Sequence, residues 1–121
     1  MYINGNSDRI MQVVINILSN AIMFSNTEGG EIWVHLYQQQ GSAFLKISDN
    51  GIGIDTDKQA LIFERFTQIH NAQLGKPKGS GLGLFITKQI VGHHNGKISV
   101  ESKPNEGATF VIELPVLGKL L

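Results

Sequence analysis

The stretch KGSGLGL, residues Lys78–Leu84, decides how the rest of this 121-residue sequence is interpreted, because its glycines come directly before an amphipathic pattern. Glycines let the backbone approach a ligand closely, and the free N–H groups at a helix N-terminus attract anions such as phosphate. Residues 75–77 do not read as the strand that a dinucleotide-binding motif needs, and Leu84 and Phe85 stand where the common phosphate loop has Lys and Ser or Thr. The stretch therefore predicts a phosphate-binding loop of another class, with a flexible glycine linker as the alternative.

Helical periodicity lies on both sides of this stretch. At about 100° per residue, apolar residues share one broad face over 7–24, and Ser7 is the expected N-terminal cap. A second helix is predicted over 82–94 and a short one over 56–63. The polar segment 67–81 has no periodicity, and loops of that length commonly act as lids or binding loops.

Four runs rich in β-branched and aromatic residues are predicted as strands: 31–37, 43–48, 97–102 and 108–114. Short turn-type sequences join the first two and the last two, so the strands form two antiparallel hairpins. The order of helices and hairpins predicts an α+β fold in which helices cover one face of a sheet. The length and the absence of an internal boundary predict one domain over 1–121.

The composition excludes several classes of function. Ten basic and ten acidic side chains balance, so the overall charge does not indicate a nucleic-acid or anionic-membrane partner. The sequence has no cysteine, which excludes disulfides, thiol chemistry and cysteine-based zinc sites. No apolar run approaches the roughly 18 residues of a membrane span, and residues 1–5 lack the features of a signal peptide. We therefore expect a cytoplasmic domain without direct membrane contact of its own, with the cytosolic part of a membrane-bound protein as the alternative.

A second motif, Asp49–Gly53, reads DNGIG and lies at the end of a predicted strand. A carboxylate in that place can accept a hydrogen bond from an amine, and adenine carries one. The two glycines keep the adjoining wall free of side chains. Taken alone, the motif is explained at least as well by an ordinary turn as by a binding site.

A third feature is a pair of asparagines, Asn16 and Asn20, one helical turn apart. Asparagine lowers helix propensity, so two on one face call for a reason. Asn20 could offer its carbonyl oxygen to Mg²⁺, a hard ion that prefers oxygen ligands, and Asn16 could orient a water or an attacking group. The alternative is a pair of ordinary surface asparagines.

In this order and spacing, the motifs resemble the nucleotide-binding boxes of the sensor histidine kinases, within the superfamily of gyrase-type and heat-shock ATPases. Asn16–Ala21 resembles the asparagine box, Asp49–Gly53 and Gly79–Leu84 the two glycine boxes, and Phe63–Phe66 the phenylalanine box. The resemblance covers residues 5–115. It implies a two-layer α/β sandwich of the Bergerat type, with a mixed, mostly antiparallel sheet and a flexible ATP lid over 67–81.

The resemblance also implies roles for single residues. Asp49 would bind the adenine amino group, and Phe24 would line the adenine pocket. Asn20 would hold Mg²⁺ against the triphosphate, with Asn16 beside the γ-phosphate. Arg65 would stabilise charge on the transferring phosphoryl group, although an exposed surface arginine is the alternative. The remaining residues implied in ATP binding belong to the glycine boxes and the lid: Gly51, Gly53, Lys78, Gly79, Ser80, Gly81, Leu82 and Gly83.

The sequence departs from the family pattern at three points. Met23 stands where the family commonly has Lys or Arg, and losing one charge-assisted contact costs about 1.5–3 kcal/mol, or about ten- to a hundredfold in affinity. The family's domain usually begins with a helix and strands ahead of residue 2, so we expect an N-terminally truncated domain. None of the four histidines has a phosphoacceptor setting.

These features predict the ATP-binding catalytic domain of a two-component sensor histidine kinase. It would donate the γ-phosphoryl group of ATP to a histidine on a separate helical dimerisation domain, with a response-regulator receiver domain downstream. A hydrolase or serine kinase of the same superfamily is one alternative, although such hydrolases usually carry a glutamate where this chain has Asn16. A degenerate docking module that binds nucleotide weakly is the other.

Overall fold

The computed structural model describes residues 2–25, 28–64 and 83–117. In chain order its elements are α1 (Ser7–Phe24), β1 (Ile32–Gln39), β2 (Ser42–Asp49), the 3₁₀ turns η1 (Thr56–Lys58) and η2 (Leu61–Phe63), α2 (Gly83–His93), β3 (Lys97–Ser102) and β4 (Ala108–Pro115). The predicted long helices and all four strands are therefore present. The predicted short helix over 56–63 is instead two separate 3₁₀ turns.

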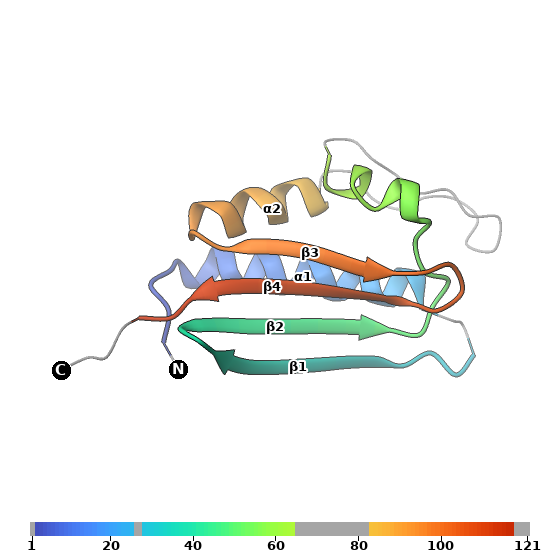
Figure 1. Ribbon diagram of the computed structural model, residues 1–121, viewed down its shortest axis with the longest axis horizontal. Coiled ribbons are helices and arrows are strands. Elements are labelled where there is room, and N and C mark those ends of the chain that lie inside the picture. Colours follow the sequence, from blue (N-terminus) through green and yellow to red (C-terminus); the bar gives the residue numbers. More distant parts are fainter. Residues whose placement is uncertain (1, 26–27, 65–82, 118–121) are drawn as a thin grey trace.

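The four strands form one sheet in the order β1-β2-β4-β3, and every described pairing is antiparallel. The mixed sheet implied by the resemblance is thus purely antiparallel in the described ranges. Helix α1 runs across one face of this sheet, and α2 packs beside it (Figure 1). The core lies between the two layers, so the predicted α+β arrangement of helices on one sheet face is confirmed.

The residues of the core come from both helices and from the two central strands. Helix α1 buries every third or fourth residue, as the predicted amphipathic face requires. Strand β4 alternates buried and half-buried residues, because successive side chains point to opposite faces. The most buried apolar side chains, each at most 3% exposed, are Val13, Ile17, Ala21, Ile47, Val91, Phe110 and Ile112.

Helix α1 begins one residue later than its cap, and the cap is Asn6 rather than the predicted Ser7. The Asn6 side chain accepts a hydrogen bond from the backbone N–H of Arg9 at 3.1 Å. Ser7 is the first helical residue, so the prediction was wrong by one position. Asparagine is as good an N-cap as serine, and it satisfies one of the unpaired N–H groups of the first turn.

His94, just beyond α2, ties the two helices together at the start of α1. Its Nδ1 lies 2.8 Å from the carbonyl oxygen of Ile90, and its Nε2 lies 3.1 Å from the backbone nitrogen of Asn6. Because a carbonyl oxygen only accepts, Nδ1 carries the proton and Nε2 accepts from Asn6. The neutral ring therefore fixes one end of the seam between α1 and α2.

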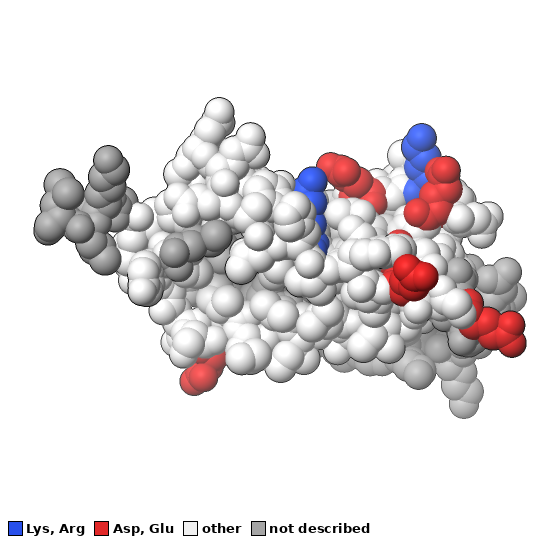
Figure 2. All heavy atoms as spheres, turned by 90° about the horizontal axis from the view of Figure 1, so that it is seen from below, with Lys and Arg blue, Asp and Glu red and all other residues white. Residues whose placement is uncertain are grey.

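The helix layer does not reach over β1, which is an edge strand. Val34 and Leu36 pair in register with Ile47 and Leu45 of β2, yet they are 59% and 61% exposed. Figure 2 views the molecule from the side on which β1 lies, and few charged side chains are visible in the middle of this view. Among the described helices, none is both long and apolar enough to cross a membrane.

Candidate functional site

Asp49 is the last residue of β2, and the residue is buried, with 6% of its surface exposed. Its Oδ1 accepts a hydrogen bond from the backbone N–H of Gly51 at 2.8 Å. Burial raises the pKa of this carboxyl above its ordinary value, although backbone hydrogen bonds from Gly51 and Ala108 act in the opposite direction. A ligand that donates a hydrogen bond to this carboxylate would favour its ionised form.

The predicted binding residues Phe24, Asp49 and Gly51 come together at one corner. The backbone N–H of Ile52 donates to the carbonyl oxygen of Phe24 at 3.2 Å, which joins the end of α1 to the segment after β2. A Cβ added to Gly51 would meet both this carbonyl oxygen and the Asp49 carboxyl. Phe24 is itself 8% exposed but stands outside the main cluster of core residues.

The glycines of this motif are required by the protein's own packing. Gly53 has φ +73°, a conformation that other residues rarely adopt, and a Cβ there would overlap the backbone of Lys103. At Gly51 the obstacle is the backbone of Phe24. The sequence reading gave these glycines a ligand-facing role, and the structure adds that they let three backbone segments meet beside Asp49.

Asn50 fastens the turn that follows α1, a role that the sequence reading did not assign. Its Oδ1 accepts from the backbone N–H of Glu31 at 2.9 Å, and its Nδ2 donates to the carbonyl oxygen of Gly29 at 2.9 Å. The signal available in the sequence was an Asn beside a glycine at a strand end, which commonly bonds to neighbouring backbone. Asn50 thereby holds the turn at 29–31 close to the Asp49 corner.

The predicted pair Asn16 and Asn20 takes part in a second polar group, at the seam between α1 and α2. The Nδ2 of Asn16 donates to the carbonyl oxygen of Gly83 at 3.2 Å and to the Oγ1 of Thr87 at 3.1 Å. The Thr87 hydroxyl donates to Gly83 at 2.8 Å, and the Nδ2 of Asn20 donates to the carbonyl oxygen of Asn16 at 2.9 Å. The sequence reading missed Thr87, because a threonine inside an apolar helix gives no distinct signal.

The orientation of Asn20 fits the proposed Mg²⁺ ligand. Because its amide nitrogen donates to a carbonyl oxygen, its own Oδ1 is the atom left for another partner. Mg²⁺ binds oxygen and usually keeps several waters, so one amide oxygen beside a triphosphate is a suitable donor set. Met23, half-buried on the same helix, brings no charge to this face.

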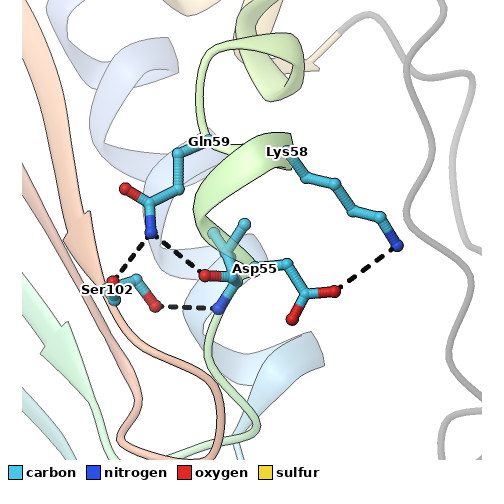
Figure 3. A network of polar contacts seen from close by, with 5 residues as sticks. Asp55, Lys58, Gln59 and Ser102 are labelled. Atoms are coloured by element: carbon cyan, nitrogen blue, oxygen red, sulfur yellow. Dashed lines mark hydrogen bonds and ion pairs between the residues drawn. The ribbon is translucent and has the colours of Figure 1, made fainter.

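A polar network holds the segment after Gly53 against β3 (Figure 3). The Nε2 of Gln59 donates to the carbonyl oxygens of Ile54 at 3.0 Å and Ser102 at 2.7 Å, and the Ser102 hydroxyl accepts from the N–H of Ile54 at 2.8 Å. The exposed pair Lys58–Asp55 at 3.7 Å adds little stability. This network joins the segment 54–59 to the end of β3.

The other predicted boxes are described only in part. Phe63, the first residue of the phenylalanine box, packs edge-on against Phe110 with ring centroids 6.2 Å apart, so it belongs to the core. Gly83 is the first described residue of the second glycine box. The predicted site residues that lie outside the described residues are Arg65, Lys78, Gly79, Ser80, Gly81 and Leu82.

Residues 5–118 match the protein family described as histidine kinase-, DNA gyrase B- and HSP90-like ATPase. The circadian input-output histidine kinase CikA of Synechococcus elongatus is 37% identical over 107 residues. That match covers 88% of this chain and 14% of CikA, so the chain spans a small part of its relative.

Two solved structures are similar in fold as well as in sequence. The mycobacterial sensor histidine kinase MprB has a TM-score of 0.82 and 36% identity, over 97% of this chain and 76% of that one. Full-length ShkA in complex with AMPPNP has a TM-score of 0.77 and 28% identity, over 93% of this chain and 23% of that one. The predicted resemblance to sensor histidine kinases is confirmed.

Proposed function

From the premise that this chain belongs to the histidine kinase-, DNA gyrase B- and HSP90-like ATPases and is the catalytic ATPase domain of the sensor histidine kinase type, we propose the following reaction. The domain binds ATP with Mg²⁺ and donates the γ-phosphoryl group to a histidine on a separate helical dimerisation domain. A response-regulator receiver domain then takes the phosphoryl group. The domain works in the cytoplasm, where ATP is available.

The observation that carries the proposal is the buried carboxyl of Asp49 at the corner shared with Phe24 and Gly51. A buried carboxylate without a full set of donors is costly to the free protein, and the exocyclic amine of adenine is a suitable donor. The complex of ShkA with AMPPNP supports an adenine nucleotide as the ligand of this fold.

The asparagine pair would act at the other end of the nucleotide. Asn20 Oδ1 would hold Mg²⁺, which neutralises charge on the phosphates when it is bound. Asn16 lies one turn away and can order a polar group or water near the γ-phosphate. Neither side chain is a nucleophile, so catalysis would rest on positioning and charge neutralisation rather than on covalent chemistry by the protein.

A second function, a docking module that binds nucleotide weakly, is favoured by one observation. Met23 leaves the last turn of α1, which follows Asn20, without a basic side chain. A superfamily hydrolase is less favoured, since the amide of Asn16 cannot act as the general base that activates water. Measured binding and transfer separate these functions.

The experiment is a calorimetric titration with AMPPNP, in Mg²⁺ or in EDTA, of the wild-type chain and Asn20→Ala. We expect the variant to lose affinity by about ten- to a hundredfold in Mg²⁺ and to match the wild type in EDTA. Ser19→Ala, at the exposed neighbouring position of α1, is the matched control and should bind like the wild type. Transfer from labelled ATP to the histidine-bearing helical domain then tests the kinase reaction.

Each outcome decides between the functions. A folded wild-type chain that binds no AMPPNP would contradict the proposal and favour the docking module. Binding without transfer to the helical domain would also favour the docking module. Equal loss of affinity in Mg²⁺ and in EDTA would contradict the role of Asn20 in holding the metal.

A further inference from the structure

Thr87 is one of two buried polar side chains in the described part of the chain, and it is 0% exposed. The other is Asp49, which the proposed function already uses. A buried hydroxyl needs partners, and Thr87 has two: it donates to the carbonyl oxygen of Gly83 and accepts from the Nδ2 of Asn16. A valine would fill almost the same volume, so packing alone does not require a hydroxyl here.

The contacts of Gly83 and Thr87 together fix which way the amide of Asn16 is turned. Its Nδ2 has two acceptors, the carbonyl oxygen of Gly83 at 3.2 Å and the Oγ1 of Thr87 at 3.1 Å. The reverse orientation would place the amide oxygen of Asn16 against the carbonyl oxygen of Gly83, which is repulsive. Asn16 therefore keeps its Oδ1 for a partner outside this group, and no donor from the described residues reaches that atom.

The same contacts extend to Asn20. The backbone carbonyl oxygen of Asn16 accepts from the Nδ2 of Asn20 at 2.9 Å, so both asparagines have their amide nitrogens bound and their amide oxygens left over. Thr87 on α2 is thus connected to the oxygen atoms of two side chains on α1.

We propose that Thr87 is a positioning residue of the Mg²⁺–nucleotide site: its hydroxyl, together with the carbonyl oxygen of Gly83, holds the amide of Asn16 so that the oxygen, not the nitrogen, is left for the ion. This inference rests on the proposed function. Thr87 itself does not touch the nucleotide. The hydroxyl of Thr87 should therefore raise the nucleotide affinity that depends on Mg²⁺ and should not change the binding of adenine.

The test compares Thr87→Val, which removes the hydroxyl at nearly constant volume, with Thr87→Ser, which keeps it. We expect Thr87→Val to weaken AMPPNP binding in Mg²⁺ by about three- to tenfold while affinity in EDTA stays within twofold of the wild type. Thr87→Ser should restore the wild-type affinity in Mg²⁺. Ile90→Val, another buried position of α2, is the matched control for a small packing change and should leave both affinities unchanged.

Two results would overturn the proposal. One is wild-type affinity of Thr87→Val in Mg²⁺, and the other is an equal loss in Mg²⁺ and in EDTA together with a lowered melting temperature, which indicates a purely structural role. If the wild-type chain itself shows no Mg²⁺-dependent binding, the proposed function fails instead, so the two failures are distinguishable.

A measurement on the wild-type chain tests the same proposal without requiring that a variant folds. The side-chain amide hydrogens of Asn16 should exchange with solvent at least tenfold more slowly, in nuclear magnetic resonance spectra, than those of the exposed Gln39. Exchange as fast as that of Gln39 would show that the amide is not held, and it would overturn the proposal.

Discussion

The Asp49 corner and the seam between α1 and α2 are two polar centres of the described fold, and they differ in how well the protein satisfies their hydrogen-bonding groups. At the corner a charged group is buried, and burial raises its pKa because backbone N–H donors compensate only part of the lost hydration. At the seam, neutral groups of Asn16, Asn20 and Thr87 bond to one another and to backbone carbonyls.

The difference indicates two ways of preparing a binding site. At the corner, burial disfavours the ionised form of Asp49, so a ligand that donates a hydrogen bond to this carboxylate should favour that form. The seam is already satisfied without ligand, and it only sets which atoms remain available. Removing the charge of Asp49 should therefore weaken binding without lowering stability, whereas substitutions at the seam should affect binding with small effects on stability.

The largest expected effect comes from the paired substitutions Gly51→Ala and Gly83→Ala. At Gly51 a Cβ overlaps the backbone of Phe24, which cannot move without displacing the end of α1, so we expect a loss of about 1–3 kcal/mol in the free energy of unfolding. At Gly83 no described atom lies within 4 Å of an added Cβ, so we expect no loss and a gain of up to about 1 kcal/mol. Chemical denaturation measures both free energies of unfolding. Equal destabilisation by the two substitutions would contradict the predicted difference between Gly51 and Gly83.

A smaller effect is expected from Met23→Lys at the seam. A lysine on the face of Asn16 and Asn20 would add a charge-assisted contact to phosphate, so AMPPNP affinity should rise by about tenfold. Raising the salt concentration should reduce this gain, because the added interaction is ionic. Met23→Gln, polar but uncharged, is the control. A gain equal to that of lysine would show that charge is not what the seam lacks.

Most of the fold could be predicted from the sequence because its helices and strands have periodic patterns of apolar residues. The apolar face of α1 and the alternation of β4 both follow from burial on one side only. Several strand ends and both ends of α2 moved by one or two residues. The bounds of α1 agree with the prediction, but its cap is Asn6 rather than Ser7, because several residue types cap a helix equally well. The uncovered face of β1 was not predictable in detail, since its apolar residues read like those of a buried strand.

The candidate site was predictable in its residue types but not in its contacts. The spacing of Asn16 and Asn20 placed them on one face, yet nothing local could show that the amide of Asn16 would bond to α2, 71 positions away at Thr87. Likewise, Gly51 and Gly53 were singled out, but the backbone segments they accommodate come from Phe24 and Lys103, which are distant in sequence. Long-range packing decides these contacts.

The raised pKa of Asp49 predicts how the stability of the corner changes with pH. Because the folded-state pKa lies above the ordinary 3.8, the folded chain binds more protons than the unfolded chain between these two values. The free energy of unfolding of the ligand-free chain should therefore fall as the pH rises through that window, and Asp49→Asn should remove this fall. AMPPNP affinity should rise with pH over the same window, since the ionised carboxylate is the better acceptor.

The measurement that tests the central claim most directly is the pair of values, AMPPNP affinity and free energy of unfolding at pH 7, for the wild type, Asp49→Asn and the exposed control Asp57→Asn. The account predicts that Asp49→Asn loses at least about tenfold in affinity and is no less stable than the wild type, while Asp57→Asn matches the wild type in both. Unchanged affinity of Asp49→Asn, or a loss of affinity accompanied by a marked loss of stability, would contradict it.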